Sequence, residues 1–240
     1  MINKIMHGDC LHLMNNIEDA SIDLILCDLP YGTTNCKWDI IIPLKNIWAH
    51  YERIIKNNGA IILTASQPFT SILISSNLKL FKYTLVWEKS KATGYLNAKK
   101  MPMRAHEDIC VFYKKPPIYN PQMKDGIPYN KGEAHRPTDV YGKQKSVLVE
   151  NTNGQRYPRS VVYFKTAESE GRVYHPTQKP LALFEWIIKT YTNEGDLVLD
   201  NCIGSGTTAL AAKINKRNFI GIEKNFEYVE ISKMRLEMLE

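Results

Sequence analysis

Hydrophobic periodicities typical of helices and of strands alternate along most of the chain. Residues 22–27 form a short apolar run typical of a buried strand, and residues 44–55 repeat apolar side chains on one helix face. The Asn57-Asn58-Gly59 sequence after that helix predicts a left-handed glycine cap. Further strands are predicted over 60–64, 81–87, 108–113 and 218–222, and further helices over 11–17, 68–75 and 181–191. This alternation predicts an α/β fold whose mainly parallel sheet has helices on both faces.

A glycine-rich turn follows the apolar run that ends at Asp200. Gly204 and Gly206 permit backbone angles that other residues avoid, and the absence of side chains would let a ligand approach the main chain. Glu223 follows about twenty positions later, after a second apolar run. This order of strand, glycine loop, helix, strand and acid is typical of sites that bind an adenosine ribose. Taken alone, it is explained equally well by a tight turn.

A second break in the pattern lies directly beyond the strand predicted at 22–27. It consists of Asp28-Leu29-Pro30-Tyr31, followed by Gly32. Ligands bind at the carboxyl ends of strands in open α/β sheets, so these residues are candidates for a site. The alternative is a turn that merely ends the strand.

The positive charge of the chain is concentrated in one segment. The 240 residues carry a formal net charge of +6, and residues 114–172 hold eleven lysines and arginines against six aspartates and glutamates, a net of +5. Aromatic residues are interleaved there: Tyr119, Tyr129, Tyr141, Tyr157, Tyr163 and Phe164. Basic and aromatic side chains together suit phosphate contacts and base stacking. We therefore predict a loop-rich, nucleic-acid-binding insertion at 114–172 between parts at 1–113 and 173–240; a solvated loop is the alternative.

The five cysteines are scattered and form no C-x-x-C pair, so neither a disulfide framework nor a zinc site is expected. A reducing cytoplasm suits this pattern. No apolar run approaches the roughly 20 residues that cross a bilayer, so we expect no membrane association. No ligand cluster for a metal is evident.

Three motifs together resemble the amino-methyltransferases of DNA. They are Asp28-Leu29-Pro30-Tyr31, the His175-to-Pro180 segment HPTQKP, and Gly204-Ser205-Gly206-Thr207-Thr208. Their order, with the tetrapeptide first and the glycine loop last, resembles the β class, which is circularly permuted. The resemblance extends from about Gly8 to Glu230 and implies a Rossmann-like fold, S-adenosylmethionine as cofactor and double-stranded DNA as substrate.

The resemblance also implies the catalytic residues. Asp28 and the Leu29 carbonyl would accept hydrogen bonds from an exocyclic amine, and so direct its lone pair toward the methyl group. Tyr31 would stack on a base turned out of the duplex, and Pro30 would stiffen the turn. The family has proline where this chain has Leu29, but the carbonyl is retained.

For the cofactor, the resemblance implies binding by the acids Asp9, Asp200 and Glu223, by Lys179 near the cofactor carboxylate, and by Cys202, Gly204, Ser205, Gly206 and Thr207. Asn201 and Cys202 replace the family's proline and aromatic residue, so the packing under the cofactor is expected to differ. Asp9 could instead cap a helix, and Lys179 could be a solvated lysine at a helix start. His106-Glu107 resembles a family motif near the target base, but a surface turn explains this pair equally well. His106 and Glu107 are therefore left outside the predicted site.

Aspartate at the first tetrapeptide position is typical of the adenine enzymes of this family, so we predict methylation of adenine N6, with cytosine N4 as the alternative. A nicotinamide-dependent oxidoreductase is a second alternative, although little chain follows Gly204 to complete its fold. An inactive DNA-binding subunit and an RNA substrate are also left open. So are the recognition sequence, homodimerisation and a cognate restriction endonuclease.

Overall fold

The computed structural model describes residues 1–34, 36, 39–134 and 146–239. Tyr141 of the predicted insertion therefore lies outside the described residues. Two compact units are distinguished: one consists of residues 1–120 and 160–240, and the other of residues 121–159.

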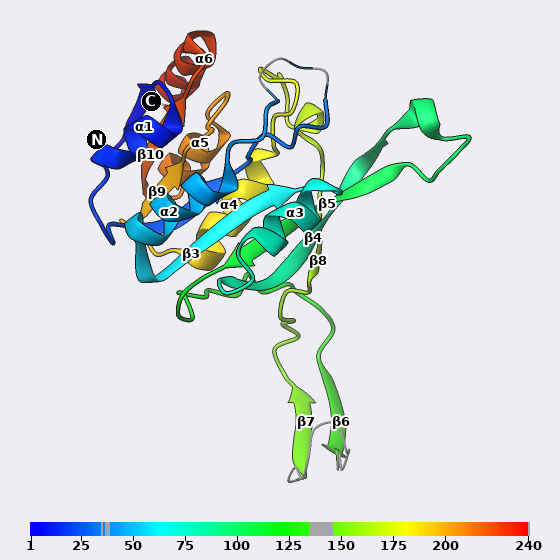
Figure 1. The fold of residues 1–240 in the computed structure, drawn as a ribbon. Coiled ribbons are helices and arrows are strands. Elements are labelled where there is room, and N and C mark those ends of the chain that lie inside the picture. Colours follow the sequence, from blue (N-terminus) through cyan, green and yellow to red (C-terminus); the bar gives the residue numbers. More distant parts are fainter. Residues whose placement is uncertain (35, 37–38, 135–145, 240) are drawn as a thin grey trace. The chain divides into compact units, whose positions relative to one another are not determined.

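An eight-stranded mixed sheet forms the centre of the larger unit as described (Figure 1). Its strands, in spatial order, are β1 (Lys4–His7), β10 (Asn218–Glu223), β9 (Leu197–Asp200), β2 (Ile22–Cys27), β3 (Ile55–Ala65), β5 (Arg104–Phe112), β4 (Phe81–Thr93) and β8 (Val161–Phe164). The first five are parallel, β5 is antiparallel to both neighbours, and β8 runs parallel to β4. The predicted sheet, mainly parallel, is confirmed.

Helices cover both faces of this sheet, as the sequence predicts. One core cluster joins the sheet to α1 (Cys10–Leu13), the short 3-10 helix η1 (Met14–Asn16), α2 (Leu44–Ile54) and α3 (Phe69–Ser76). The other joins it to α4 (Leu181–Tyr191), α5 (Thr207–Ile214) and α6 (Phe226–Glu237). Strand β2 supplies both clusters by simple alternation, since Ile25 faces the first and Leu24 and Leu26 face the second.

The predicted glycine cap at Gly59 is wrong. Helix α2 ends at Ile54, and β3 begins at once with Ile55 and runs through Gly59. A Cβ at Gly59 would lie 2.8 Å from the carbonyl oxygen of Asp23, so the position is glycine because β2 approaches closely. The Asn57-Asn58-Gly59 pattern thus indicates a close backbone approach within a strand. Strand β1 and helix α6 were not predicted, because neither segment has a strong periodicity.

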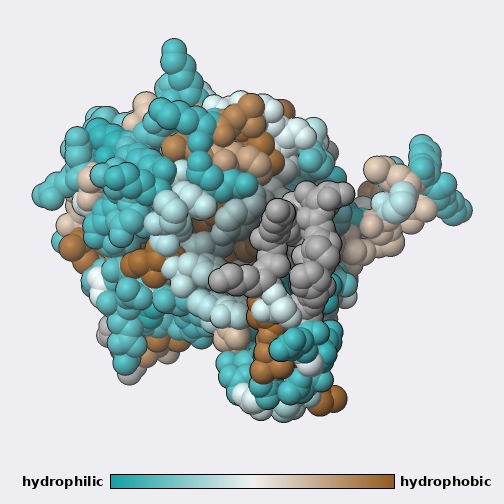
Figure 2. Space-filling view, turned by 90° about the horizontal axis from the view of Figure 1, so that it is seen from below, coloured by the Kyte–Doolittle hydropathy of each residue, from teal (hydrophilic) through white to brown (hydrophobic). Residues whose placement is uncertain are grey.

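Strands β4 and β5 continue past the sheet as a two-stranded arm, which Figures 1 and 2 show projecting from the larger unit. The arm carries the 3-10 helix η2 (Tyr95–Asn97) at its tip. A further 3-10 helix, η3 (Ala167–Ser169), follows β8. Among the described residues, we find no helix with the length and apolar character needed to span a bilayer.

The smaller unit contains an antiparallel pair, β6 (Tyr129–Ala134) and β7 (Val147–Asn151). It lies within the predicted insertion at 114–172, whereas β8, at the end of that range, belongs to the large sheet. The Arg156 guanidinium lies 4.6 Å from the centre of the Tyr129 ring and donates to the Gly154 carbonyl. Basic and aromatic side chains are therefore in contact in this unit, and binding of nucleic acid by it stays a prediction.

Candidate active site

Four neighbouring parallel strands end in acidic residues at one edge of the sheet. Glu223 ends β10 and Asp200 ends β9, while Asp28 follows β2 directly and Asp9 lies two residues beyond β1. Strands β2 and β9 pair directly, with Leu24 opposite Val198. The strand ends at Asp28 and Asp200 are therefore neighbours in the sheet, although these residues are far apart in sequence.

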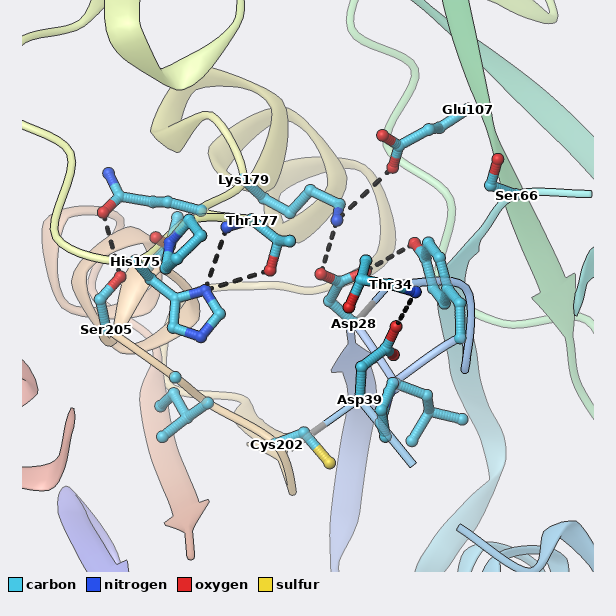
Figure 3. A pocket seen from close by; sticks show the side chains of 18 of the residues that line it. Asp28, Thr34, Asp39, Ser66, Glu107, His175, Thr177, Lys179, Cys202 and Ser205 are labelled. Atoms are coloured by element: carbon cyan, nitrogen blue, oxygen red, sulfur yellow. Dashed lines mark hydrogen bonds and ion pairs between the residues drawn. The ribbon is translucent and has the colours of Figure 1, made fainter. Parts of the chain in front are cut away.

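A pocket of about 1170 Å³ lies along this acidic edge (Figure 3). This volume slightly exceeds the range typical of small-molecule sites. With the exception of Gly206, all the predicted site residues line it: Asp9, Asp28, Leu29, Pro30, Tyr31, Lys179, Asp200, Cys202, Gly204, Ser205, Thr207 and Glu223. The structure therefore brings the two halves of the predicted site together.

The Asp28 carboxylate is held by three side chains. Its Oδ1 accepts hydrogen bonds from the hydroxyls of Tyr31, at 2.7 Å, and Thr64. Its Oδ2 accepts from Lys179 Nζ at 2.5 Å (Figure 3). A carboxylate has about four acceptor positions, so three partners fix its orientation and leave it able to accept one more hydrogen bond.

Lys179 lies between two acids in the interior. Only 7% of its side chain is exposed, and its ammonium pairs with Asp28 and, at 3.4 Å, with Glu107 Oε2. Burial alone would lower the pKa of Lys179, but the charges of Asp28 and Glu107 outweigh it and raise that pKa above its ordinary value. This cation therefore neutralises charge at the Asp28 end of the pocket, and its predicted position beside the cofactor carboxylate stays a prediction.

Glu107 extends this ion pair into a network. Its Oε1 accepts from Lys89 Nζ at 3.0 Å, and both residues lie on the adjacent strands β4 and β5. Burial would raise the pKa of Glu107, but the neighbouring charges of Lys179 and Lys89 lower it. The predicted site omitted Glu107. The available signal was the resemblance of His106-Glu107 to a family motif near the target base.

Tyr31 has contacts that the sequence did not reveal. Its ring stacks on Phe69, with centroids 5.3 Å apart and an interplanar angle of 22°. Its hydroxyl donates to Asp28, and burial together with the charges of Asp28 and Glu107 raises its pKa. Phe69 thus stacks on the ring, and the Lys179 ammonium also lies over it, 5.5 Å from its centroid. The Leu29 side chain is buried in the core, which fixes its backbone at the pocket.

Asp39 holds the loop that follows the tetrapeptide. Its carboxylate accepts hydrogen bonds from the backbone amides of Gly32, Thr33 and Thr34 at 2.7–2.9 Å. Burial raises its pKa, but these amides outweigh that effect and lower it. The sequence reasoning missed Asp39, for which the only signal is an acid shortly after a Gly-Thr-Thr turn.

The HPTQKP segment connects the two halves of the pocket. Gln178 Oε1 accepts from the Ser205 hydroxyl at 3.0 Å, while the next residue, Lys179, reaches Asp28 (Figure 3). The His175 ring lies over Gly204, since a Cβ at Gly204 would be 3.8 Å from His175 Cδ2. Burial lowers the pKa of His175, against the opposing charge of Asp28.

Gly204 and Gly206, the two glycines of the loop after β9, have different structural roles. Both have positive φ, 52° at Gly204 and 88° at Gly206, as the sequence predicts. Gly204 lines the pocket, and a Cβ there would meet only the His175 ring. At Gly206 a Cβ would lie 2.9 Å from the Cβ of Ser232. Gly206 therefore permits packing of α6 against the loop and does not line the pocket.

Asp200 is an acid satisfied by neutral donors. Its side chain accepts from the Thr208 hydroxyl at 2.5 Å and the Cys202 amide at 3.0 Å, and the residue is only 3% exposed. Burial raises the pKa of Asp200 to about 7, against the lowering effect of these hydrogen bonds. Cys202 packs against the core cluster that includes Cys10 and Cys27. Contact with Cys10 and Cys27 and burial together raise the pKa of the Cys202 thiol.

The two remaining acids are fixed by backbone amides. Glu223 accepts from Gly204 at 2.9 Å and from Asn225 at 2.7 Å, which ties the end of β10 to the glycine loop. Asp9 caps α1 by accepting from the Leu11 amide at 2.9 Å, as the alternative predicted, and it also lines the pocket. In the part of the chain that the structure describes, no group of three or more His, Cys, Asp or Glu side chains is placed to hold a metal.

Comparisons with known proteins agree with this geometry. The sequence model of the N6_N4_Mtase family, described as DNA methylase, matches residues 22–234. The chain is 32% identical to the DNA adenine methyltransferase YhdJ of Escherichia coli, over 98% of this chain and 82% of that protein. It is 29% identical to the Type II methyltransferase M.HpaI of Haemophilus parainfluenzae, over 99% and 75%. The structure of the M1.HpyAVI–SAM complex superposes with a TM-score of 0.65 at 28% identity, over 97% of this chain and 98% of that one.

The Lys179 network gives a prediction about stability. Replacing Lys179 by methionine leaves Asp28 and Glu107 without the cation between them, so we expect the free energy of unfolding at about pH 7 to fall by about 3–5 kcal/mol. The deficit should shrink as the pH is lowered toward about 4, because the buried Glu107 carboxylate, without the charge of Lys179 that lowers its pKa, then takes up a proton more readily in the folded variant than in the folded parent. Denaturant titration at several pH values measures both effects.

Lys216→Met is the matched control, because Lys216 is 75% exposed and pairs only weakly with Glu194. We expect no measurable change from it. A Lys179→Met protein as stable as the parent at neutral pH would contradict the assigned network.

Proposed function

The chain belongs to the N6_N4_Mtase family of DNA methylases, and on this premise we propose that it transfers a methyl group from S-adenosylmethionine to N6 of an adenine turned out of duplex DNA. One observation carries the proposal: the Asp28 carboxylate at the end of β2 and the Gly204 loop after β9 line the same pocket. An acceptor for an amine and a site for an adenosine-type ligand are thereby brought side by side.

The donor groups of the pocket suit S-adenosylmethionine. This cofactor supplies an electrophilic methyl group on a positively charged sulfonium, and it also carries an ammonium, ribose hydroxyls and an adenine amine. Asp200, Glu223 and Asp9 offer carboxylate oxygens to such donors, and Gly204 leaves space above its backbone. We assign Glu223 to the ribose hydroxyls, Asp9 to the adenine amine and Asp200 to the ammonium. Ser205, Thr207 and Cys202 would border the methionine portion.

The catalytic residues would act on the amine of the target base. The remaining acceptor position of Asp28 would bind one amine hydrogen, and the Leu29 carbonyl would bind the other. These bonds favour a tetrahedral nitrogen with its lone pair free for attack, and they stabilise the positive charge that develops there. Pro30 would keep both acceptors in place, and the base would stack against Tyr31, which lines the pocket.

Adenine is favoured over cytosine by two observations. Aspartate stands at the first position of the tetrapeptide, and YhdJ, which is named as an adenine methyltransferase, is similar over almost the whole chain. Cytosine N4 remains the alternative within the same family. Family membership gives no support to the nicotinamide-dependent alternative. Recognition of a specific sequence by residues 114–172, self-association and a cognate endonuclease remain predictions.

Replacing Asp28 by alanine tests the catalytic assignment. We expect methyl transfer from labelled cofactor to duplex DNA to fall at least about a hundredfold, because the developing charge on the amine loses its acceptor. Cofactor affinity, measured by calorimetry, should change little. The buried ammonium of Lys179 is not left unpaired in this variant, because it keeps Glu107 as a partner.

Asp19→Ala is the control, since Asp19 is 75% exposed and pairs with Arg53 away from the pocket. Transfer at the parental rate by the Asp28→Ala protein would show that another group performs the proposed role.

The identity of the methylated base can be read directly. We expect that DNA methylated with labelled cofactor and digested to nucleosides will contain the label in N6-methyl-2′-deoxyadenosine. Mass spectrometry of the nucleosides distinguishes this product from N4-methyl-2′-deoxycytidine. Label only in the cytosine product would overturn the adenine assignment and leave the family assignment intact.

Asp200 gives a prediction about pH. Its pKa of about 7 means that its charge appears as the pH rises through neutrality, so affinity for the cationic cofactor should increase between about pH 6 and about pH 7.5. Asp200→Asn keeps an acceptor oxygen for one of Thr208 and Cys202, presents an N–H group to the other, and has no charge to gain. The cofactor's own amine titrates in both proteins, so the difference between them isolates Asp200. Parallel affinity profiles for the two proteins would contradict the assignment of Asp200 to the ammonium.

A further inference from the structure

The arm formed by residues 91–104, between the sheet portions of β4 and β5, exposes several large apolar side chains. Tyr95 is 73% exposed, Leu96 81% and Met101 58%, and Met103 is 40% exposed. Apolar side chains gathered at the tip of a projecting element are typical of a contact surface. Figure 2 shows this arm projecting with hydrophilic and hydrophobic surface side by side.

The charge of the arm identifies the kind of partner. Lys91, Lys99, Lys100 and Arg104 give it four positive charges, and no acidic residue lies between Glu88 and Glu107. Because acidic and basic residues nearly balance outside residues 114–172, the net charge of the chain does not reveal this second basic segment. Cationic side chains suit the backbone phosphates of DNA, and an aromatic and aliphatic tip suits its stacked bases.

The arm is ordered and fixed at its root. The Asn97 carbonyl accepts from the amides of Lys100 and Met101 at 2.8 and 3.0 Å, which shapes the tip. Arg104 Nη1 donates to the Ser66 hydroxyl at 2.7 Å, which ties the arm to the end of β3. Because β3 also supplies Thr64 to Asp28, the root of the arm has a fixed relation to the catalytic aspartate.

The arm also borders the pocket. Lys91, Gly94, Tyr95 and Arg104 are among the residues that line it. A base that enters the pocket from a duplex leaves a gap in the base stack beside the pocket mouth. The apolar tip is thus attached at the place where such a gap would open.

We propose that residues 91–104 act as a wedge that enters the duplex as the target base leaves it. Leu96 and Met101 fill the gap in the stack, and Lys99 and Lys100 contact the flanking phosphates. Filling the gap compensates for the lost stacking and so favours the flipped base. This inference rests on the proposed function, because it requires duplex DNA whose target base is flipped.

The test compares the Leu96→Ala/Met101→Ala protein with the parent on two duplexes. One is fully paired, and the other has an abasic site opposite the target, so that flipping costs little. We expect kcat/KM to fall about tenfold on the paired duplex, because the variant loses roughly the free energy of one stacking contact. On the abasic duplex kcat/KM should fall far less. Leu78→Ala is the control, because Leu78 is 66% exposed on another loop; it should leave both rates unchanged.

A 2-aminopurine at the target position reports flipping by its fluorescence without methyl transfer. The parent should raise that fluorescence more than the double variant does. Equal activity and fluorescence for the two proteins, or equal loss on both duplexes, would overturn the wedge. So would a parental dimer that the double variant converts to monomers in sedimentation velocity, since the tip would then be a self-association surface. A parent that flips the base but transfers no methyl group would contradict the proposed function and leave the wedge supported.

Discussion

The Lys179 ammonium lies between the carboxylates of Asp28 and Glu107, and the arrangement of the reacting end of the pocket depends on that position. Lys179 comes 151 positions after Asp28, two residues before α4, while Glu107 lies on β5. A buried cation between two carboxylates is stable only when all three groups are held in place, because each unpaired charge in the interior costs several kcal/mol. The ion pair therefore joins segments that are distant in sequence and orients the carboxylate proposed to act on the amine.

The acidic edge has two halves, which differ in whether a positively charged group or a neutral donor binds the carboxylates. Asp28 is balanced by a buried ammonium, whereas Asp200 and Glu223 accept from hydroxyl and amide donors that bring no positive charge. The half of the pocket around the glycine loop thus keeps a negative charge that favours a cationic cofactor. The other half is neutral on balance and suits an uncharged base. The register of β2 with β9 places these two environments next to each other.

Much of this arrangement is predictable from local sequence. The limits of β2 and α4 follow from apolar periodicity, and the positive φ of Gly204 and Gly206 follows from their place in the loop. Long-range contacts are not predictable in this way. The partner of Lys179, the anchoring of the loop by Asp39 and the packing of Ser232 on Gly206 all depend on residues that meet only in the folded chain. Gly59 shows the same limit, since a capping pattern is indistinguishable in sequence from a close approach to Asp23.

The central claim is that one cofactor bridges the two strand ends so that its methyl group faces Asp28. A crystal structure of the protein with S-adenosylmethionine bound tests this claim most directly. We expect the ribose on Glu223 and the methyl carbon directed at the space beside the Asp28 carboxylate, where an amine nitrogen would lie about 3–3.5 Å from that carbon. A cofactor bound with its methyl group directed away from Asp28, or bound outside the pocket, would contradict the account.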